Sequence, residues 1–128
     1  MSTFALSTKR KQQVINITAE VHDIVRAAGV KDGLCIVQSL HTTAGIFCNV
    51  TEDLEQDIFK VFDTLAPDDN YNHNKYDPNA EAHLKKIIMG RTVTLTITNG
   101  TVDLGTWEKI QFAEFDGPRE RTVHVKVL

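Results

Sequence analysis

Apolar and polar residues alternate over several short stretches of this chain, a pattern that predicts β-strands with one buried face. Residues 3–7 and 13–17 are the first two stretches, and the charged triplet between them predicts an N-terminal hairpin. Asn99-Gly100 predicts a second tight hairpin turn. The other stretches predicted as strands are residues 33–40, 45–50, 92–97, 107–115 and 122–127.

Two stretches with apolar residues at helical spacing come before the middle of the chain. Residues 18–28 form the first, with Thr18 as the predicted N-cap and Gly29 as the C-cap. The second is expected to begin at the cap Thr51 and to end before Pro67. Its apolar stripe consists of Leu54, Ile58, Phe62 and Leu65.

A third predicted helix follows a long polar loop at residues 67–77. Asp77 is its expected cap, Pro78 takes the first helical position, and Gly90 ends it. Its predicted buried stripe is Ala80, Leu84, Ile87 and Ile88. Many strands with short turns and three helices predict an α+β fold, an antiparallel or mixed β-sandwich in one domain of residues 1–128.

Composition narrows the functional classes. The formal net charge of -3 argues against a nucleic-acid binder, which would usually show a basic face. No apolar run reaches the length of a membrane span, and the N-terminus does not resemble a signal peptide, so we expect a cytoplasmic protein with no membrane partner. Cys35 and Cys48 lie in strand-like segments without C-x-x-C spacing, which favours reduced, buried thiols.

Three histidines stand on different predicted elements: His41 at a strand end, His73 in the long loop and His83 on the third helix. Histidines from separate elements can converge on one divalent metal and leave a position open for substrate. Their spacing alone is not a familiar ligand pattern and favours ordinary hydrogen-bonded histidines. His22 and His124 fall outside the inward faces of their elements and are not expected to take part.

Hydroxyl and guanidinium groups supply candidate contacts for an anion. Thr42 and Thr43 directly follow His41, and their hydroxyls can bind phosphate oxygens or satisfy the backbone of their own turn. Arg119 and Arg121 belong to a predicted turn that either binds a planar anion or is simply solvated. A nucleophile elbow and a glycine-rich phosphate loop are both missing from the sequence.

Five short motifs occur together along the chain, and in this combination they resemble the YjbQ family, whose members are also called secondary thiamine-phosphate synthases. The resemblance covers essentially the whole chain. The motifs are His41-Thr42-Thr43-Ala44, Tyr71-x-His73, Asn79-Ala80-x-Ala82-His83-Leu84, Gly105-Thr106-Trp107 and Asp116-Gly117-Pro118-Arg119.

This resemblance implies an α+β sandwich that assembles as a homotrimer, with a polar, histidine-lined pocket near the subunit boundary. It also implies weak thiamine-phosphate synthase activity, in which a pyrimidine diphosphate and a thiazole phosphate are joined and pyrophosphate is released. The physiological substrate is left open. A divalent metal, Zn²⁺ or Mg²⁺, is the expected cofactor, and a phosphorylated small molecule is the expected ligand.

Two positions depart from the family pattern. Val50 stands where relatives often have a glutamate, and Glu108 follows Trp107 where a glutamine is usual. Asp57 on the next helix is a candidate substitute for the missing carboxylate.

The resulting assignments are as follows. Candidate catalytic residues are His41, Asp57 and Arg119. Candidate metal ligands are His41, His73 and His83. Candidate substrate contacts are Thr42, Thr43, Asn79, Trp107, Arg119 and Arg121. Two alternatives to the synthase stay open: a metal-dependent hydrolase of phosphorylated metabolites, and a binding module for a metal or a phosphometabolite without catalysis.

Overall fold

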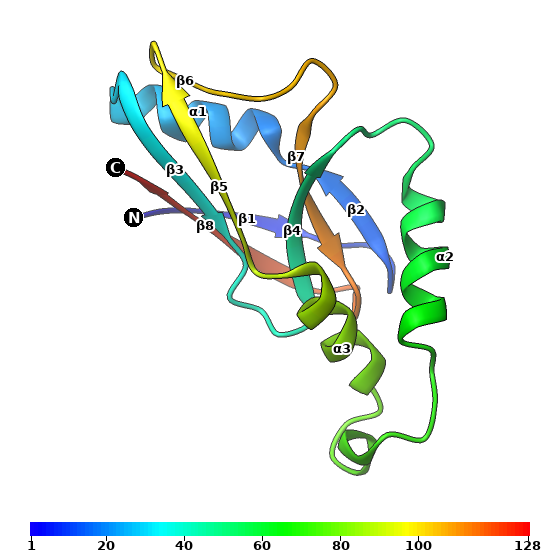
Figure 1. Cartoon of the computed structure of the whole chain (residues 1–128). Helices are drawn as coiled ribbons and strands as arrows, with labels where there is room; N and C mark the ends of the chain where they lie inside the picture. The colour runs from blue at the N-terminus through cyan, green and yellow to red at the C-terminus, as the bar shows by residue number, and fades with distance from the viewer.

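The apolar faces of two antiparallel sheets pack against each other in the computed structural model, which describes residues 1–128 (Figure 1). The elements in chain order are β1 (Ser2–Ser7), β2 (Gln13–Asn16), α1 (Thr18–Ala28), β3 (Asp32–Gln38), β4 (Ala44–Asn49), α2 (Glu55–Leu65), the 3₁₀ helix η1 (Asn72–Lys75), α3 (Ala80–Met89), β5 (Thr92–Thr98), β6 (Thr101–Val102), β7 (Lys109–Glu114) and β8 (Glu120–Val127). The predicted α+β sandwich with three α-helices is therefore confirmed, and no helix has both the length and the hydrophobicity to cross a membrane.

One sheet has five strands in the order β1-β8-β3-β5-β6, and the other has three in the order β2-β7-β4. Every neighbouring pair is antiparallel, so the mixed alternative does not apply. The turn predicted at Asn99-Gly100 joins β5 to β6, and both of its residues have positive φ angles of 53° and 84°. Two successive positive φ values are what a tight hairpin turn requires, which explains the Asn-Gly pair.

The predicted N-terminal hairpin is wrong. β1 pairs with β8 and β2 pairs with β7, so the first two strands lie in different sheets. Ser7 faces Glu120 before the crossing and Gln13 faces Glu114 after it, so the same register continues from one sheet to the other. The two connecting segments bond to each other, from Thr8 N to Arg119 O at 2.9 Å and from the backbone N of residue 117 to the carbonyl of residue 11 at 3.0 Å. The two strand pairs therefore form one antiparallel ribbon that bends from one sheet to the other. The hydrogen bonds along this ribbon satisfy the backbone groups that the predicted hairpin would have paired.

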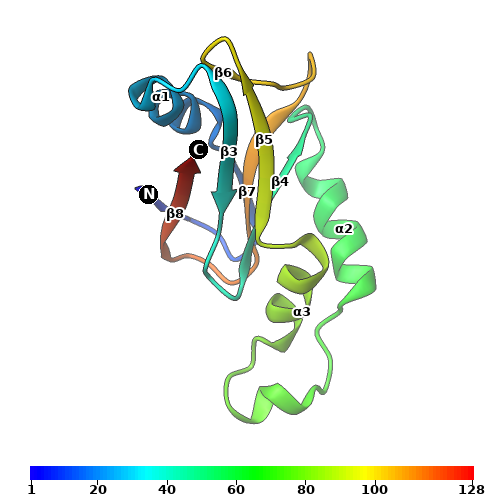
Figure 2. The same cartoon turned by 60° about the vertical axis from the view of Figure 1, so that its left-hand side comes forward.

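The main core lies between the two sheets and is closed at one end by α1 (Figure 2). Alternate residues of β3, β5 and β8 face inward, as their sequence pattern predicts. The buried hydrophobic residues of this core are Ile17, Val21, Val25, Cys35, Val37, Ala44, Ile46, Leu95, Ile97, Val102, Ile110, Phe112, Val123 and Val125. Gly29 ends α1 in the left-handed conformation, as predicted, with φ of 70°.

A smaller core covers the opposite face of the three-stranded sheet, where α2 and α3 pack. Phe59 of α2 and Phe115 beyond β7 meet edge to face, with ring centroids 6.0 Å apart. The start of α2 differs from the prediction, because residues 52–54 form a turn and the helix begins at Glu55. Leu65 of the predicted stripe is exposed, and Phe59 is the buried residue of this helix.

The buried face of α3 differs in part from the prediction, because Ala80 is buried as predicted but the two isoleucines of the predicted stripe are not. Ile87 is 75% exposed and Ile88 is 49% exposed, whereas Glu81 and Lys85 are buried. The charged residues can point inward because each meets an opposite charge: Glu81 pairs with Lys11 at 2.9 Å and Lys85 with Asp63 at 2.6 Å. Asn79, not Asp77, is the residue before the first turn. The outward face is therefore apolar.

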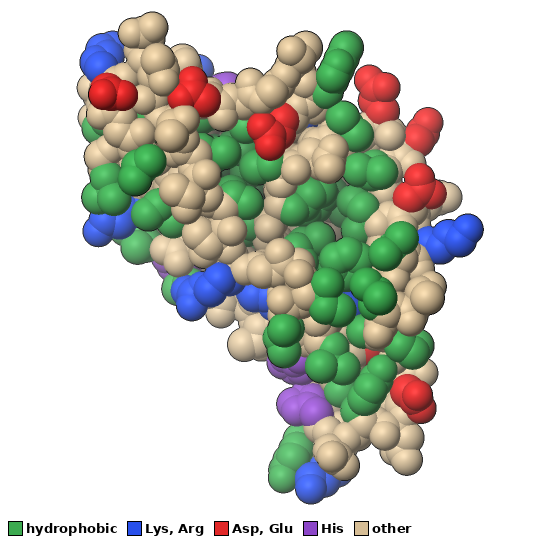
Figure 3. All heavy atoms as spheres, viewed as in Figure 1, with side chains coloured by type: hydrophobic (Ala, Val, Ile, Leu, Met, Phe, Trp, Pro, Cys, Tyr) green, Lys and Arg blue, Asp and Glu red, His purple; other side chains and the backbone are tan.

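This apolar face forms one surface of the molecule (Figure 3). Hydrophobic side chains gather there over α2 and α3, and histidine side chains border the lower end of the patch. Val61 and Leu65 of α2 contribute to it along with Ile87 and Ile88 of α3. Contiguous apolar surface of this kind marks a site of association more often than a solvated face.

The two cysteines are free thiols, as the sequence predicts. Burial raises the pKa of Cys35 to about 11 and also that of Cys48 to about 11, with the charge of Glu108 adding to the latter. Because the thiolate is the reactive form, neither side chain is a candidate nucleophile.

Candidate functional site

Residues 39–44 connect β3 to β4 and include the first residue of β4; we call this segment the 39–44 turn, and hydrogen bonds hold it from several sides. Ser39 is buried, and its hydroxyl donates to the carbonyl of Ala44 at 2.8 Å, which closes the turn on itself. The backbone N of Ser39 donates to Arg91 O at 2.8 Å, and Thr43 O accepts from Phe115 N at 3.0 Å. This turn carries the first of the five motifs, so the side chains of His41, Thr42 and Thr43 extend from a backbone that is held in place.

A cavity of about 450 Å³ lies beside this turn, and we call it the histidine pocket. It unites the 39–44 turn with the segment before α3, with α3 itself and with the start of β8. Its lining residues are Leu40, His41, Thr42, Thr43, His73, Asp77, Asn79, His83, Asp116, Arg119 and Arg121. The three predicted histidines and both predicted arginines therefore line one cavity.

A chain of hydrogen bonds runs along one wall of the histidine pocket. Arg119 Nη2 donates to Asp116 Oδ2 at 3.0 Å, and Asn79 Nδ2 donates to the same oxygen at 2.8 Å. The amide of Asn79 is thereby oriented with its oxygen toward His73 Nε2, which lies 3.1 Å away. His73 Nε2 must carry a hydrogen to donate to that oxygen, which leaves Nδ1 of the neutral ring as an acceptor.

His41 is fixed in a different way. The backbone N of Thr122 donates to His41 Nε2 at 2.9 Å, so the neutral ring carries its hydrogen on Nδ1. Burial lowers the pKa of His41, and the nearby charge of Arg121 lowers it further. His41 is therefore a neutral hydrogen-bond donor at neutral pH.

A buried ion pair between Arg121 and Glu114 supports the back of the pocket. Glu114 Oε1 accepts from Arg121 Nε at 2.8 Å and from Thr8 Oγ1 at 2.8 Å, and Oε2 accepts from Asp116 N at 3.0 Å and from Arg121 Nη2. Arg121 Nη2 also donates to Thr43 Oγ1 at 2.9 Å. Most of the guanidinium group is thus committed to protein partners, and it fixes the orientation of the Thr43 hydroxyl.

Known proteins resemble this chain over its whole length. The family description "UPF0047 protein YjbQ-like" matches residues 2–128. A UPF0047 protein of Methanothermobacter thermautotrophicus is 40% identical over 95% of this chain and 87% of its own length. YugU of Bacillus subtilis, also a UPF0047 protein, is 33% identical over 100% of this chain and 98% of its own length.

This chain belongs to the YjbQ/UPF0047 family. A crystal structure from Clostridium acetobutylicum, described as an uncharacterized conserved protein of that family, superposes with a TM-score of 0.94 at 40% identity and covers 100% of both chains. A hypothetical protein from Aeropyrum pernix gives a TM-score of 0.96 at 38% identity, over 99% of this chain and 96% of that one. The resemblance predicted from the five motifs is confirmed, and so is the fold that it implied.

His41, His73 and His83 line one pocket, but within this chain they are not arranged as a single ligand set, so the metal site stays a prediction. The rings of His73 and His83 are close, with centroids 4.6 Å apart and an interplanar angle of 72°. His41 Nε2 is occupied by the backbone N–H of Thr122. No group of three or more His, Cys, Asp or Glu side chains is arranged to hold a metal ion. Since ligand imidazoles need a free nitrogen lone pair aimed at the metal, His41 in this tautomer is not a ligand, and the two remaining histidines alone do not make a Zn²⁺ site.

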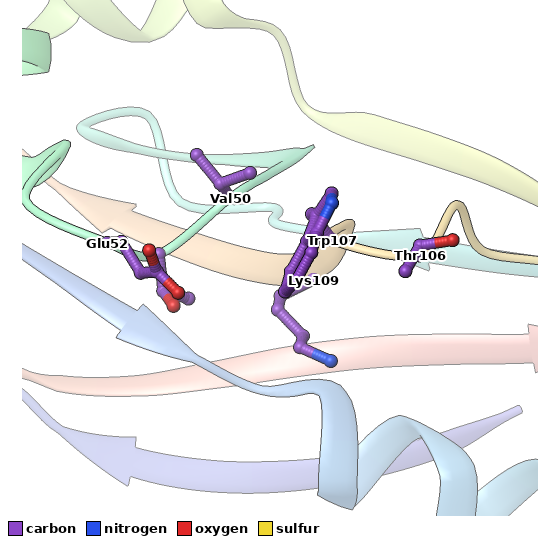
Figure 4. Close-up of a pocket in the computed structure, with 6 residues that line it drawn as sticks. Val50, Glu52, Thr106, Trp107 and Lys109 are labelled. Carbon is purple, nitrogen blue, oxygen red and sulfur yellow. The ribbon is translucent and has the colours of Figure 1, made fainter.

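Asp57 and Trp107 lie outside the histidine pocket. Asp57 is exposed in the first turn of α2 and is not part of the lining, so it does not replace a catalytic carboxylate there. Trp107 is 69% exposed and lines a separate cavity of about 520 Å³ (Figure 4). Lys109 lies beside Trp107 in that cavity, and Glu52 lies across from both. The sequence predicted that Asp57 and Trp107 belong to the same site as the histidines. No local sequence pattern determines how far either residue lies from the histidines in the fold.

Three charged residues near the pocket were not assigned from the sequence. Asp77 and Asp116 are its two carboxylates. Asp116 stands in the fifth motif and could have been found from it. Lys86 lies behind the 39–44 turn and lines a neighbouring hollow that shares Thr42 and His83 with the histidine pocket. No spacing rule in the sequence marks it.

Replacing Glu114 by Gln keeps the shape of the side chain but leaves the buried Arg121 charge uncompensated. We expect a loss of about 3–5 kcal/mol in the free energy of unfolding. Asp23→Asn is the control, because the Asp23 and Arg26 side chains are 74% and 72% exposed, and its effect should stay within about 0.5 kcal/mol. Urea unfolding at one fixed protein concentration measures both. Equal effects would contradict the structural role of the ion pair.

The pKa of His41 should lie below the reference value of about 6.5, with its hydrogen on Nδ1. Because the unfolded chain then binds a proton more readily, the stabilising contribution of neutral His41 is complete above that pH and is lost as the pH falls toward the folded pKa. A ¹⁵N-edited NMR titration, with the signal identified by its loss in His41→Gln, measures the pKa and the tautomer. A midpoint at or above the reference value would contradict the lowering of the pKa by burial and Arg121, and a hydrogen on Nε2 would show that the contact with Thr122 is wrong.

Proposed function

We propose that the histidine pocket binds a small phosphorylated molecule. The observation that carries the proposal is the convergence of hydrogen-bond donors from four segments on one cavity of about 450 Å³. The donors are of three kinds: the neutral imidazole of His41, the hydroxyls of Thr42 and Thr43, and the guanidinium groups. A cavity of this size matches a small metabolite, and hydroxyl, imidazole and guanidinium donors are suited to phosphate oxygens.

Arg119 is the cation best placed to meet such a ligand. Its side chain is half exposed at the rim of the pocket, and its partner Asp116 is shared with Asn79. A guanidinium group at the rim of a pocket is already partly in contact with water, so it can bind a phosphate with two hydrogen bonds at a small desolvation cost. Arg121 also lines the pocket, and its Nη1 makes no hydrogen bond within the chain, so it is a second donor to a ligand there.

Thiamine-phosphate synthesis is the first reaction that we propose for this pocket, on the strength of family membership. Its leaving group is pyrophosphate, whose developing charge Arg119 and the Thr42 hydroxyl would stabilise. The names of the relatives give no activity, so the proposal depends on the family resemblance and on the donor set described above. The predicted divalent metal, Zn²⁺ or Mg²⁺, stays a prediction without support from the donor geometry of this chain.

Hydrolysis of a phosphorylated small molecule is the second candidate, and one observation favours it. Asp116 orients Asn79, which orients His73 and leaves Nδ1 of that ring free to accept a proton. A histidine held by a second polar group in this manner is suited to general base catalysis. Binding without turnover is the third outcome, and it would make the protein a non-catalytic binding module. A cytoplasmic location is part of the same proposal.

Inorganic pyrophosphate should bind the purified protein, and Arg119→Ala or His83→Ala should weaken binding about tenfold or more, as expected for the loss of a charge-assisted or buried hydrogen bond. Isothermal titration calorimetry measures the affinity. His22→Ala and His124→Ala are the matched controls, since neither residue lines the pocket.

Turnover is followed by chromatography, with the two phosphorylated thiamine precursors in one arm and a panel of phosphomonoesters in the other. Product in the first arm supports the synthase, and product in the second supports the hydrolase. No binding by the parent protein would overturn the proposed function.

We also propose a homotrimer, supported by the family resemblance and by the apolar face over α2 and α3. Burying that face between subunits would remove exposed isoleucine and leucine side chains from water. Light scattering at micromolar concentration should give three chains per particle. Ile87→Glu should shift the particle toward monomer, whereas Thr94→Glu, which adds the same charge on the exposed face of β5, should not. A monomeric parent would contradict the trimer. Dissociation in Thr94→Glu but not in Ile87→Glu would show that the apolar face over α2 and α3 is not the subunit interface.

A further inference from the structure

Lys86 makes an unusual set of contacts behind the histidine pocket. Its Nζ donates to three backbone carbonyls, those of Ser39 at 3.1 Å, His41 at 2.6 Å and Ala44 at 2.6 Å. All three carbonyls belong to the 39–44 turn, which lies more than forty residues earlier in the chain. The contact therefore ties α3 to the turn that carries the first motif.

The number of hydrogens on Lys86 Nζ equals the number of carbonyl oxygens that it contacts. An ammonium group has three hydrogens, and each finds one carbonyl oxygen. Lys85, the buried lysine of the same helix, is paired with a carboxylate, as is the exposed Lys11, but Lys86 forms no ion pair. Without Lys86 the carbonyls of Ser39 and His41 would lose a side-chain donor in a partly buried region, and such acceptors are costly to leave unpaired.

We propose that Lys86 is a positioning residue for the histidine pocket: its ammonium group holds the 39–44 turn in the shape that presents His41, Thr42 and Thr43 to the ligand. This inference rests on the proposed function for its consequence in ligand binding. The effect of Lys86 on the shape of the 39–44 turn does not depend on a ligand. The geometry is specific because three carbonyls on one side of the turn face Lys86 while the side chains of the same turn line the pocket.

The charge of Lys86 adds a second consequence. Burial lowers the pKa of Lys86 to about 8, and the charges of Arg91 and Arg121 contribute in the same direction. The titratable and charged groups around it are these two arginines together with His41 and His83, so no carboxylate faces it. Arg119 and Arg121 each have a carboxylate partner, whereas Lys86 has none. Lys86 lines the hollow that shares Thr42 and His83 with the histidine pocket, so an anion bound there would lie near its charge.

The sign of the pH dependence separates ligand binding from folding. Anion affinity should fall as the pH rises through about 8, because the ammonium loses its proton. The folded pKa lies below the ordinary lysine value of 10.5, so between these two pH values the unfolded chain binds more protons. The contribution of Lys86 to stability therefore rises with pH over that window, and a loss of binding there is not a loss of folding.

The first test needs no ligand. Amide hydrogen exchange across residues 39–44 is compared in the parent, Lys86→Met, Lys86→Arg and Lys85→Met. We expect about tenfold faster exchange in Lys86→Met, as a lost buried hydrogen-bond set predicts, and recovery in Lys86→Arg. Lys85→Met is the matched control, because it removes a buried lysine from the same helix that contacts Asp63 instead of the turn. Unchanged exchange in Lys86→Met, or equal acceleration in Lys85→Met, would overturn the inference.

The second test uses inorganic sulfate, whose double negative charge does not change across the pH window. Sulfate affinity should fall about tenfold in Lys86→Met, as expected for one lost charge-assisted contribution, and should lose its dependence on pH near 8. Lys86→Arg should keep the affinity of the parent and hold it at higher pH, since a guanidinium stays charged.

The two proposals fail in different ways. If the parent binds neither sulfate nor pyrophosphate, the proposed function falls, and hydrogen exchange alone decides the role of Lys86 in the turn. If the parent binds sulfate and Lys86→Met binds it equally well at every pH, the role of Lys86 in binding is overturned while the proposed function stands. Should Lys86→Met not fold, the exchange and the pH profile of Lys86→Arg against the parent still decide the question.

Discussion

The buried ion pair of Glu114 and Arg121 is the interaction on which the rest of the structure depends. It lies where the ribbon formed by β1–β2 and β7–β8 crosses from one sheet to the other, and Thr8 from the first crossing segment donates to the same carboxylate. A carboxylate buried this deeply is tolerable only with all its acceptor sites filled, and its four donors fill them. Through Thr43 the same pair reaches the 39–44 turn, so the sandwich and the pocket share one electrostatic support.

The orientation of α3 has consequences on both of its sides. Its inward face carries charged residues that meet partners from the N-terminal crossing, from α2 and from the 39–44 turn. Its outward face keeps isoleucines that the chain alone does not cover. The helix thus gives up some burial of apolar surface within one chain and gains polar contacts that position the pocket. Assembly into an oligomer would recover the lost burial.

Family membership and the pocket support different kinds of statement. Identity of 40% over nearly the whole chain, with a TM-score of 0.94 to a solved relative, establishes the fold. Function has to be argued from the site, because one fold supports many chemistries. Here the site offers the neutral imidazole of His41, hydroxyls and guanidinium groups, a donor set for an anion. The occupied Nε2 of His41 weighs against the metal that histidines alone suggested.

Most strands and helices, and much of the site, could be predicted from the sequence alone. Alternation predicted the strands, the Asn99-Gly100 pair predicted its hairpin, and the five motifs predicted that His41, His73, His83 and Arg119 would line one cavity. Only the tertiary structure decided which strand pairs with β1, which face of α3 is buried, and that Asp57 and Trp107 lie elsewhere. The reason is that periodicity and turn chemistry are local properties of the chain. Strand partners, buried charge pairs and the contacts of Lys86 join residues far apart in sequence, and only the packed fold brings them within hydrogen-bonding distance.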